Sequence, residues 1–345
     1  MKPVPQSESD VRAIDLLTAV ATRYHLLGES QVEIARDLEL DPSTVSRYLK
    51  RARDEGIVHV EIRPPRREHV EVGREVAQRF GLARVVVASA APGDIDAVAA
   101  VGAGFVEGLL RTGMRLGISW GRTLASVVGH LRPGVVSKLS VAQLAGGVND
   151  PAPGIQGHEL VRELAELYPD SRVHYLHAPA IVRSVAVRRA LLGDPSIHSA
   201  LDAARRSDLA LVGIGQMEPA ATLPQGGHVS PVDWRLLVEQ GAVGNMNTRF
   251  FDADGRPLAA LERRTIAVEW RDLRAISTVV AVASGIEKVA AISGALRSEC
   301  VDVLITDETT ATRLLMDDSG VGRRRSTAHA GALAGSGSRS REEPA

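Results

Sequence analysis

The chain has 345 residues, enough for two domains, and 44% of them are apolar, so that a large core can be buried. A formal net charge of −1 and a single cysteine, Cys300, argue against a protein coated with nucleic acid and exclude an internal disulfide or a multi-cysteine zinc site. The N-terminus lacks the apolar core of a signal peptide, and no run approaches the about 18 apolar residues of a membrane span. We therefore expect a cytoplasmic protein that makes no contact with membranes.

Four segments differ in pattern along the chain. Residues 8–63 have the pattern of helices followed by a short strand, and residues 64–69 form a polar linker whose two prolines cannot continue a helix. Residues 70–318 alternate apolar strands with amphipathic helices. Residues 319–345 are rich in Gly, Ser and Arg, a composition that predicts a disordered tail.

The first of two short helices in residues 8–63 is marked by its start signal. Ser30 and Glu33 have the spacing of a capping box, which satisfies free N–H groups at the start of a helix. One face of this helix is expected to contain Val32, Ala35 and Leu38. Since Ala35 is small, it allows a second helix to cross closely.

The second helix is expected after a turn at residues 39–40. Asp41 is a good N-cap, Pro42 suits the first helical position, and Gly56 suits the end of the helix. The buried stripe of this helix is expected to consist of Val45, Leu49 and Ala52. A helix upstream has apolar residues that can cover the pair, namely Ile14, Leu17, Ala21 and Tyr24. Two helices crossing after a short turn predict a helix-turn-helix.

The exposed face of the second helix carries hydroxyls and basic side chains. The residues that we expect at the DNA are Gln31, Ser43, Thr44, Ser46, Arg47, Lys50 and Arg51. Short hydroxyls and Arg47 can reach base edges in the major groove, whereas Lys50 and Arg51 are better placed for phosphates. Residues 47–67 hold seven Lys or Arg against three acids, which favours double-stranded DNA over a solvated helical hairpin. Residues 57–62 are a candidate wing strand.

The alternation in residues 70–318 predicts an α/β fold. The expected strands are the apolar runs Arg84–Ser89, Arg115–Ser119, Leu139–Ala145, Val173–Ala178, Asp208–Ile214, Ile276–Ala283 and Val301–Thr306. The expected helices between several of them are Val98–Leu110, Thr123–Leu131, His158–Tyr168 and Glu287–Leu296. This repetition predicts a doubly wound, mostly parallel sheet, and an aromatic content of only 3% suits its aliphatic core. Ligands bind such sheets at the carboxyl ends of the strands.

Glycines and polar residues follow several of these strands and form the candidate ligand site. After the second strand, Gly121 lets backbone N–H groups approach a phosphate at the start of a helix, and Ser119 and Thr123 can add hydrogen bonds. Arg122 is equally suited to pair with the phosphate or to remain solvated. The other candidates for effector binding are Gly146, Gly147, Gly215, Lys288 and Asp307.

The alternatives at these positions stay open. Gly146 and Gly147 either let backbone approach a sugar or close a turn. Lys288 is expected in the first turn of a helix, where a cation is unfavourable unless an anionic ligand or carboxylate lies beside it. For Asp307, capping of the last helix is favoured over ligand contact.

Arg23 to Arg63 resemble the DNA-binding domain of the SorC family of sugar-responsive transcription regulators. The resemblance continues, in the family's order, through Gly117-Ile-Ser-Trp-Gly-Arg-Thr-Leu124, Gln143-Leu-Ala-Gly-Gly147, Asp208–Gly215, Gly241–Gly244 with Arg249–Gly255, and Gly285–Leu296 with Thr306–Glu308. It covers about residues 12–316 and implies a sugar-isomerase-like effector domain that serves binding, in a homodimer or homotetramer. Two departures leave the ligand open: Asn245 replaces the family's usual acid, and Leu144 and Ala145 exclude a Schiff-base lysine there.

The sequence therefore predicts a transcription regulator whose affinity for operator DNA is controlled by a small sugar, phosphorylated or a related polyol. No metal, cofactor or catalytic residue is expected. One alternative is a hydrolase, since Gly117–Gly121 fits the Gly-x-Ser-x-Gly pattern with Ser119 as nucleophile. After His228, however, no histidine follows until His329 in the tail. Further alternatives are a sugar-phosphate isomerase and a large domain that serves only assembly.

Overall fold

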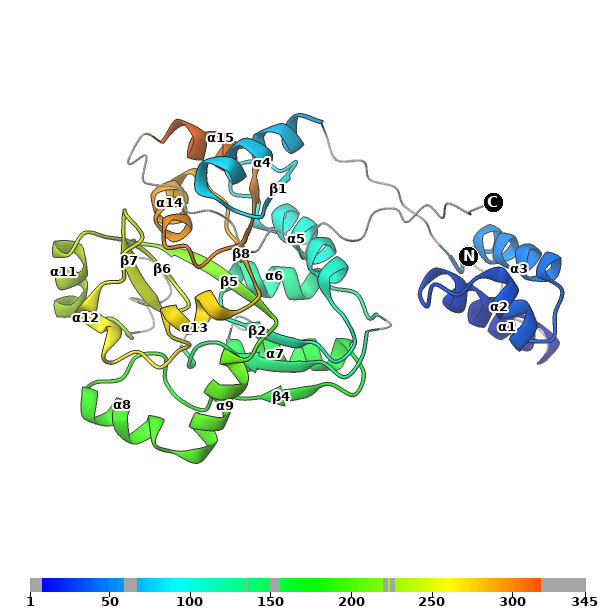
Figure 1. Cartoon of the computed structure of the whole chain (residues 1–345), viewed down its shortest axis with the longest axis horizontal. Coiled ribbons are helices and arrows are strands. Elements are labelled where there is room, and N and C mark those ends of the chain that lie inside the picture. Colours follow the sequence, from blue (N-terminus) through cyan, green and yellow to red (C-terminus); the bar gives the residue numbers. More distant parts are fainter. Residues whose placement is uncertain are drawn as a thin grey trace, which may run out of the picture. The chain divides into compact units, whose positions relative to one another are not determined.

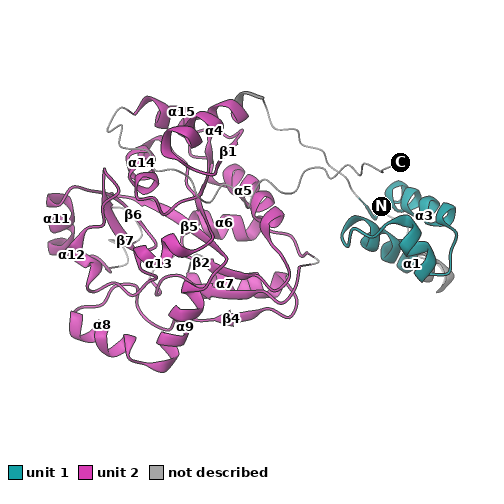
Figure 2. Cartoon of the chain, in the orientation of Figure 1, with its two compact units in different colours: residues 1–64 teal, residues 65–345 magenta. Residues whose placement is uncertain are grey.

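The computed structural model describes residues 8–58, 67–134, 136–148, 156–219, 223 and 227–317, and the chain divides into two compact units, residues 1–64 and 65–345 (Figures 1 and 2). Most of the candidate wing strand, from residue 59, and the predicted tail lie outside the described residues. None of the helices in the described ranges is long and apolar enough to cross a membrane.

The smaller unit is built from α1 (Glu8–His25), α2 (Gln31–Asp37) and α3 (Pro42–Asp54). Its core is formed by Leu17, Val20, Ala21, Ile34, Ala35, Val45, Leu49 and Ala52. The predicted stripe on α3 is confirmed, but the prediction for α2 was wrong at Val32, which is exposed while its neighbour Ile34 is fully buried. Ile14 and Tyr24 of the upstream stripe are also exposed.

The larger unit contains a parallel sheet with strand order β1-β9-β8-β5-β2-β3-β4. The seven predicted strands are confirmed with shifted ends, as β1 (Arg84–Ala88), β2 (Arg115–Ile118), β3 (Ser140–Gln143), β4 (Arg172–His174), β5 (Leu209–Gln216), β8 (Thr278–Val282) and β9 (Val303–Asp307). Successive side chains of a strand point to opposite faces. In β8, accordingly, Val280 and Val282 pack into one core cluster and Val279 and Ala281 into another.

Helices cover both faces of this sheet (Figure 1). One layer consists of α5 (Ile95–Leu109), α6 (Arg122–His130) and α7 (Gly157–Leu167). The other consists of α4 (Arg67–Phe80), α9 (Pro195–Arg205), α13 (Trp270–Ala275), α14 (Val289–Arg297) and α15 (Glu308–Met316). Because α4 begins at Arg67, residues 67–69 are helical and the predicted linker is too long at its end.

An antiparallel extension of β5 was not predicted from the sequence. The end of β5 pairs with β6 (Ala242–Met246), which pairs in turn with β7 (Arg249–Asp252). Asn247 and Thr248 join these two strands with φ of 51° and 65°, the two positive values of a two-residue hairpin turn. Short helices complete the unit: α8 (Val185–Leu192), α11 (Pro231–Glu239), α12 (Ala259–Glu262) and the 3₁₀ turn η1 (Ile286–Lys288).

Candidate functional sites: a recognition helix and a polar cavity

The α2–α3 pair has the local geometry of a helix-turn-helix. The backbone N–H of Ser30 donates to Glu33 Oε2 at 2.8 Å and that of Glu33 to Ser30 Oγ at 3.2 Å, so the predicted capping box is present. The turn passes through Glu39, whose φ is 54°. Asp41 occupies the N-cap of α3 and Pro42 its first turn, although the Asp41 side chain makes no capping bond.

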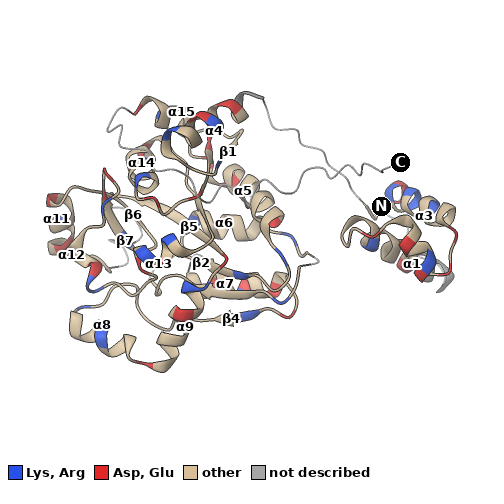
Figure 3. Cartoon of the chain, in the orientation of Figure 1, with Lys and Arg blue, Asp and Glu red and all other residues tan. Residues whose placement is uncertain are grey.

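The face of α3 opposite its buried stripe is open to solvent. Ser43, Ser46, Arg47, Lys50 and Arg51 are exposed, while Thr44 and Gln31 are half-buried. Basic side chains gather on this helix (Figure 3). Arg47 Nη2 donates to Thr44 Oγ1 at 3.0 Å, and Arg51 pairs with Glu55. Within the smaller unit, this face of α3 therefore presents hydroxyls and cations to solvent.

The larger unit has its topological switch point between β2 and β5. From β2 the chain continues through α6 to β3 on one side, whereas from β5 it continues towards β8 on the other side. The connections therefore diverge at the carboxyl ends of these two neighbours, which opens a crevice in a doubly wound sheet.

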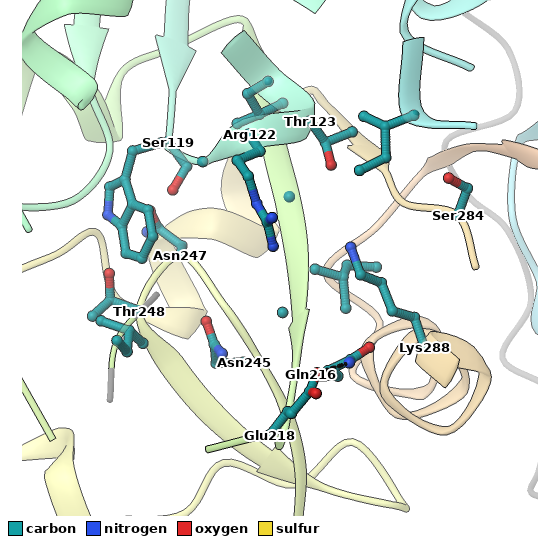
Figure 4. A pocket seen from close by; sticks show the side chains of 18 of the residues that line it. Ser119, Arg122, Thr123, Gln216, Glu218, Asn245, Asn247, Thr248, Ser284 and Lys288 are labelled. Atoms are coloured by element: carbon teal, nitrogen blue, oxygen red, sulfur yellow. Dashed lines mark hydrogen bonds between the residues drawn. The ribbon is translucent and has the colours of Figure 1, made fainter. Parts of the chain in front are cut away.

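A cavity of about 320 Å³ lies at this place, within the range of small-molecule sites (Figure 4). It is formed by the β2–α6 turn, the end of β5, the β6–β7 hairpin, the β8–α14 turn and the approach to α5. Its polar and charged lining consists of Ser119, Trp120, Arg122, Thr123, Gln216, Glu218, Asn245, Asn247, Thr248, Ser284, Glu287 and Lys288.

The start of α6 faces this cavity without a side-chain cap. Gly121 is the N-cap residue, and its φ of 123° is a conformation that favours glycine. Among the described residues, no side chain is hydrogen-bonded to the first N–H groups of α6, which carry the positive end of the helix dipole. Ser119 is buried and Thr123 half-buried beside them. An anion in the cavity can accept hydrogen bonds from these groups.

Two cationic side chains extend into the same space from different elements (Figure 4). Arg122 comes from the first turn of α6 and Lys288 from the end of η1. Neither forms a salt bridge with any residue that the structure describes. Burial lowers the pKa of Lys288, and the positive charge of Arg122 lowers it further, although Glu287 opposes both. An anionic ligand would offset the repulsion between these two cations.

Buried polar atoms without a hydrogen-bond partner are concentrated at the cavity. Within the described ranges, five such atoms belong to lining residues: Trp120 Nε1, Gln216 Oε1, Asn247 Oδ1, Thr248 Oγ1 and Ser284 Oγ. An unpaired buried polar group costs about 1–3 kcal/mol, so several together are unfavourable in the protein alone. The hydroxyls of a polyol can act as donors and acceptors for such atoms once small side-chain movements turn them towards the cavity.

The structure brings together only part of the predicted effector site. Ser119, Gly121, Arg122, Thr123, Gly215 and Lys288 line the cavity. Gly146 and Gly147 do not: a Cβ on Gly146 would lie 2.6 Å from the Ala178 oxygen, and Gly147 exchanges backbone hydrogen bonds with residues 178 and 180. Their expected role is corrected to close packing and strand-like pairing.

Asp307 also lies outside the cavity lining. It is completely buried at the N-cap of α15, where it accepts hydrogen bonds from the backbone N–H of Thr310 and of Gly285. Capping, the favoured expectation, is therefore its observed contact, and its assignment to the ligand is corrected. Lys288 lies at the junction of η1 and α14 rather than within a continuous helix.

Several lining residues were not singled out from the sequence. Gln216 and Glu218 follow the predicted end of β5, because that strand is longer than expected. Asn247 and Thr248 belong to the unpredicted hairpin, for which two adjacent polar residues between short apolar runs were the available signal. Asn245, noted only as a departure from a family pattern, lies in the cavity opposite Gly215. Among the described residues, no group of three or more His, Cys, Asp or Glu can hold a metal ion.

Comparison with known families covers both units. Residues 65–316 match the family described as "Putative sugar-binding domain", and residues 28–59 match a winged helix-turn-helix DNA-binding family. The chain is 31% identical over 302 residues to the deoxyribonucleoside regulator of Bacillus subtilis (strain 168), which spans 86% of this chain and 96% of the relative. It is 30% identical over 317 residues to the erythritol catabolism regulatory protein EryD of Brucella abortus (strain 2308), and the match spans 89% of this chain and 99% of that protein.

The fold is shared with a solved regulator. The full-length sorbitol operon regulator SorC of Klebsiella pneumoniae superposes with a TM-score of 0.69 and 28% identity, over 88% of this chain and 98% of that one. These relatives are transcription regulators, and they give no support to the hydrolase or isomerase alternatives. The chain belongs to the SorC family of sugar-responsive transcription regulators and is itself a DNA-binding transcription regulator.

Proposed function

We propose that the protein binds a palindromic operator through α3 and that a phosphorylated sugar or polyol in the cavity controls this binding. The protein acts in the cytoplasm as a symmetric homodimer or homotetramer, because paired recognition helices match the two halves of a palindrome. Gln31, Ser43, Thr44, Ser46 and Arg47 lie near base edges. Lys50 and Arg51 bind phosphates of the duplex.

The observation that carries the effector proposal is the pair Arg122 and Lys288 beside an uncapped helix start. A phosphate monoester brings close to two negative charges at neutral pH and three acceptor oxygens. It can bind the N–H groups of α6 together with both cations, whereas a neutral sugar leaves the two positive charges facing each other.

The remainder of the ligand is a chain or ring of hydroxyls. Asn245, Asn247 and Thr248 line the part of the cavity formed by the hairpin, and Gln216 and Glu218 line the part beside β5. The relatives are named for deoxyribonucleosides, erythritol and sorbitol, all of which carry a sugar or polyol with free hydroxyls. We therefore place the effector in the class of phosphate esters of small sugars or polyols.

The first experiment measures binding to the DNA-free protein by thermal shift. The panel contains sorbitol 6-phosphate, erythritol 4-phosphate and deoxyribose 5-phosphate, each beside its unphosphorylated parent and inorganic phosphate. A ligand at about 100 times its Kd stabilises the folded state by about 2.7 kcal/mol. A shift with phosphate esters that exceeds the shift with their parents supports the proposal. Equal shifts with the parents would contradict the role of the phosphate.

A double variant and a control then test whether the two cations bind the ligand. Arg122→Ala combined with Lys288→Met should weaken the best ester by about 3 kcal/mol, roughly 100-fold, because charge-assisted hydrogen bonds contribute about 1.5–3 kcal/mol each. Arg235→Ala, which removes an exposed arginine from α11 outside the cavity, is the matched control and should bind as wild type. Equal losses in the control would show that overall charge, not the site, is responsible.

A release assay connects the cavity with DNA. The full chain selects its duplex from a random library, and each panel compound is titrated into the complex. An effector must bind the DNA-bound and free forms unequally to change operator affinity. A compound that binds the protein but leaves duplex affinity unchanged is not an effector. If no phosphorylated or free sugar or polyol shifts the thermal unfolding, the alternative in which the larger unit serves only assembly is favoured.

A further inference from the structure

The first described helix of the larger unit, α4, makes polar contacts with α15 at both of its ends. Near its start, the buried ring of His69 lies with Nε2 3.1 Å from Glu308 Oε2. Near its end, Arg79 donates to the backbone oxygens of Leu315 at 2.7 Å and of Asp317 at 2.5 Å. Figure 1 shows the two helices side by side. With contacts at both ends, α4 and α15 are expected to shift together.

The start of α15 is hydrogen-bonded to the loop after β8. The backbone N–H of Gly285 donates to Thr310 Oγ1 at 2.9 Å and to Asp307 Oδ2 at 3.2 Å. Both acceptors are completely buried, and Asp307 also caps α15 through the N–H of Thr310. One N–H is therefore shared between two acceptors on a single helix start, so a small movement of Gly285 changes how it is divided between them.

Gly285 itself lies between cavity residues. Ser284 and Lys288 flank it and line the cavity (Figure 4). Ser284 Oγ is buried and has no hydrogen-bond partner among the residues that the structure describes. A ligand that engages Ser284 and Lys288 must therefore act on both sides of Gly285. The φ of 115° at Gly285 lets this loop adopt a backbone conformation that other residues rarely adopt.

We propose that a ligand in the cavity moves the loop 284–288 and that this movement reaches α4 through Asp307, Thr310 and the His69–Glu308 contact. Since the chain enters α4 from the DNA-binding unit, this route connects the effector site with the segment that joins the two units. The ligand in this route rests on the proposed function, but the mechanical connection between the loop and α4 does not. The connection is tested by whether a change at one end alters the other.

The first test measures amide hydrogen exchange in the ligand-free full chain. Thr310→Val removes one acceptor of the Gly285 N–H together with the hydrogen bond that the Thr310 hydroxyl donates to Asp307. Thr312→Val is its matched control, because within the described residues the Thr312 hydroxyl bonds inside α15, to the backbone oxygen of Glu308 at 2.9 Å. Glu308→Ala removes the partner of His69. We expect Thr310→Val to raise exchange in the α4 peptide and Glu308→Ala to raise exchange in the 284–288 peptide, by about threefold each. Changes confined to each variant's own neighbourhood would overturn the route.

The second test measures coupling with the panel ester that gives the largest thermal shift and the selected duplex. Glu308→Ala should reduce the effector-induced change in duplex affinity about fivefold while the Kd of the ester for DNA-free protein stays within about twofold. Glu308→Gln, which keeps an acceptor for His69, should restore the coupling. Unchanged coupling in Glu308→Ala would overturn the proposal. If no ester binds, the proposed effector class fails, and the exchange experiment still decides the route.

Discussion

The recognition helix and the effector cavity are built in opposite ways. The geometry of α2 and α3 is set by neighbours in sequence, such as Ser30 with Glu33, and its functional side chains lie in solvent. The cavity instead joins residues as far apart as Ser119 and Lys288, and several of its functional atoms are buried. The comparison teaches that the first site depends on local capping and the second on long-range packing. Each prediction below tests one side of this difference.

The largest effect on stability is expected at Arg249, whose hydrogen bonds hold the hairpin beside the cavity in place. Arg249 is buried and donates to the backbone oxygens of Val268 and Ala267, each at 2.8 Å, and it pairs with Glu262. Arg249→Met leaves the Ala267 oxygen without this donor and the Val268 oxygen with only a 3.4 Å bond from Asn247, and it also removes the partner of the half-buried Glu262. Breaking a buried pair costs about 3–5 kcal/mol, and we expect a loss near the lower end because Glu262 is partly exposed. Denaturant unfolding followed by Trp fluorescence should show this loss.

The control for Arg249→Met is a substitution of an exposed arginine in the same unit. Arg271→Met removes a side chain whose contacts with Glu269 and Asp272 are both 3.4 Å long, and it should change stability little. Duplex affinity of the small unit should be similar in both variants once the protein is folded. Equal stability of Arg249→Met and wild type would refute the dependence of the hairpin on long-range contacts.

The next effect concerns the exposed site. Arg47→Ala should weaken binding to the selected duplex by about 1–3 kcal/mol and relax the preference at one base pair, if Arg47 bonds a guanine edge. Arg36→Ala removes an exposed arginine from α2 and is the control. Binding measured on the selected and a scrambled duplex separates the two roles. A uniform loss on both duplexes would assign Arg47 to phosphate contact instead.

The same difference explains what the sequence could predict. The capping box, the Pro42 start and the buried stripe of α3 depend on residues within one or two turns, so they were correct. The parallel strands were also found, because each is a continuous apolar run. The β6–β7 hairpin was missed although its two-residue turn left a local signal, and the pairing of β6 with β5 could not be predicted because it joins separate parts of the sequence.

The two glycine turns show where sequence reasoning reaches its limit. Gly121 and Gly146 both follow predicted strands; Gly121 was expected to let backbone approach a phosphate, and Gly146 either to let backbone approach a sugar or to close a turn. Only the first borders the cavity, whereas the second is packed against backbone of residues 178–179. Nothing in the local sequence distinguishes a glycine that admits a ligand from one that admits another stretch of chain.

A smaller effect is expected from the local cap. Ser30→Ala removes the acceptor for the Glu33 N–H, which should destabilise the small unit by about 1 kcal/mol. Ser196→Ala, in the first turn of α9, leaves the Asp194 cap in place and serves as a comparison in the larger unit. Circular dichroism of residues 1–64 and of the full chain would measure both. A loss of ligand binding in Ser30→Ala would contradict the separation of the two sites.

The smallest effect is the pH dependence of ester binding. From acid towards neutral pH, affinity should rise as the phosphate loses its second proton near pH 6. Burial lowers the pKa of Lys288, so at higher pH this side chain loses its charge earlier than an ordinary lysine. Affinity should then fall again, by about threefold while only part of the Lys288 side chains has lost its charge.

The free energy of unfolding of the ligand-free protein should change with pH in the direction opposite to the affinity for the ester. A depressed lysine pKa means that the unfolded chain binds more protons in the window between the folded and the ordinary pKa, so the stability of the ligand-free protein rises with pH there. Lys288→Arg keeps its charge throughout and should abolish both trends above neutral pH. Calorimetric titration measures the affinity for the ester, and unfolding of the ligand-free protein at the same pH values measures its stability. If wild-type affinity and stability stay level up to the range of ordinary lysines, then Lys288 is not desolvated in the cavity, and the buried character of this site would not extend to its cations.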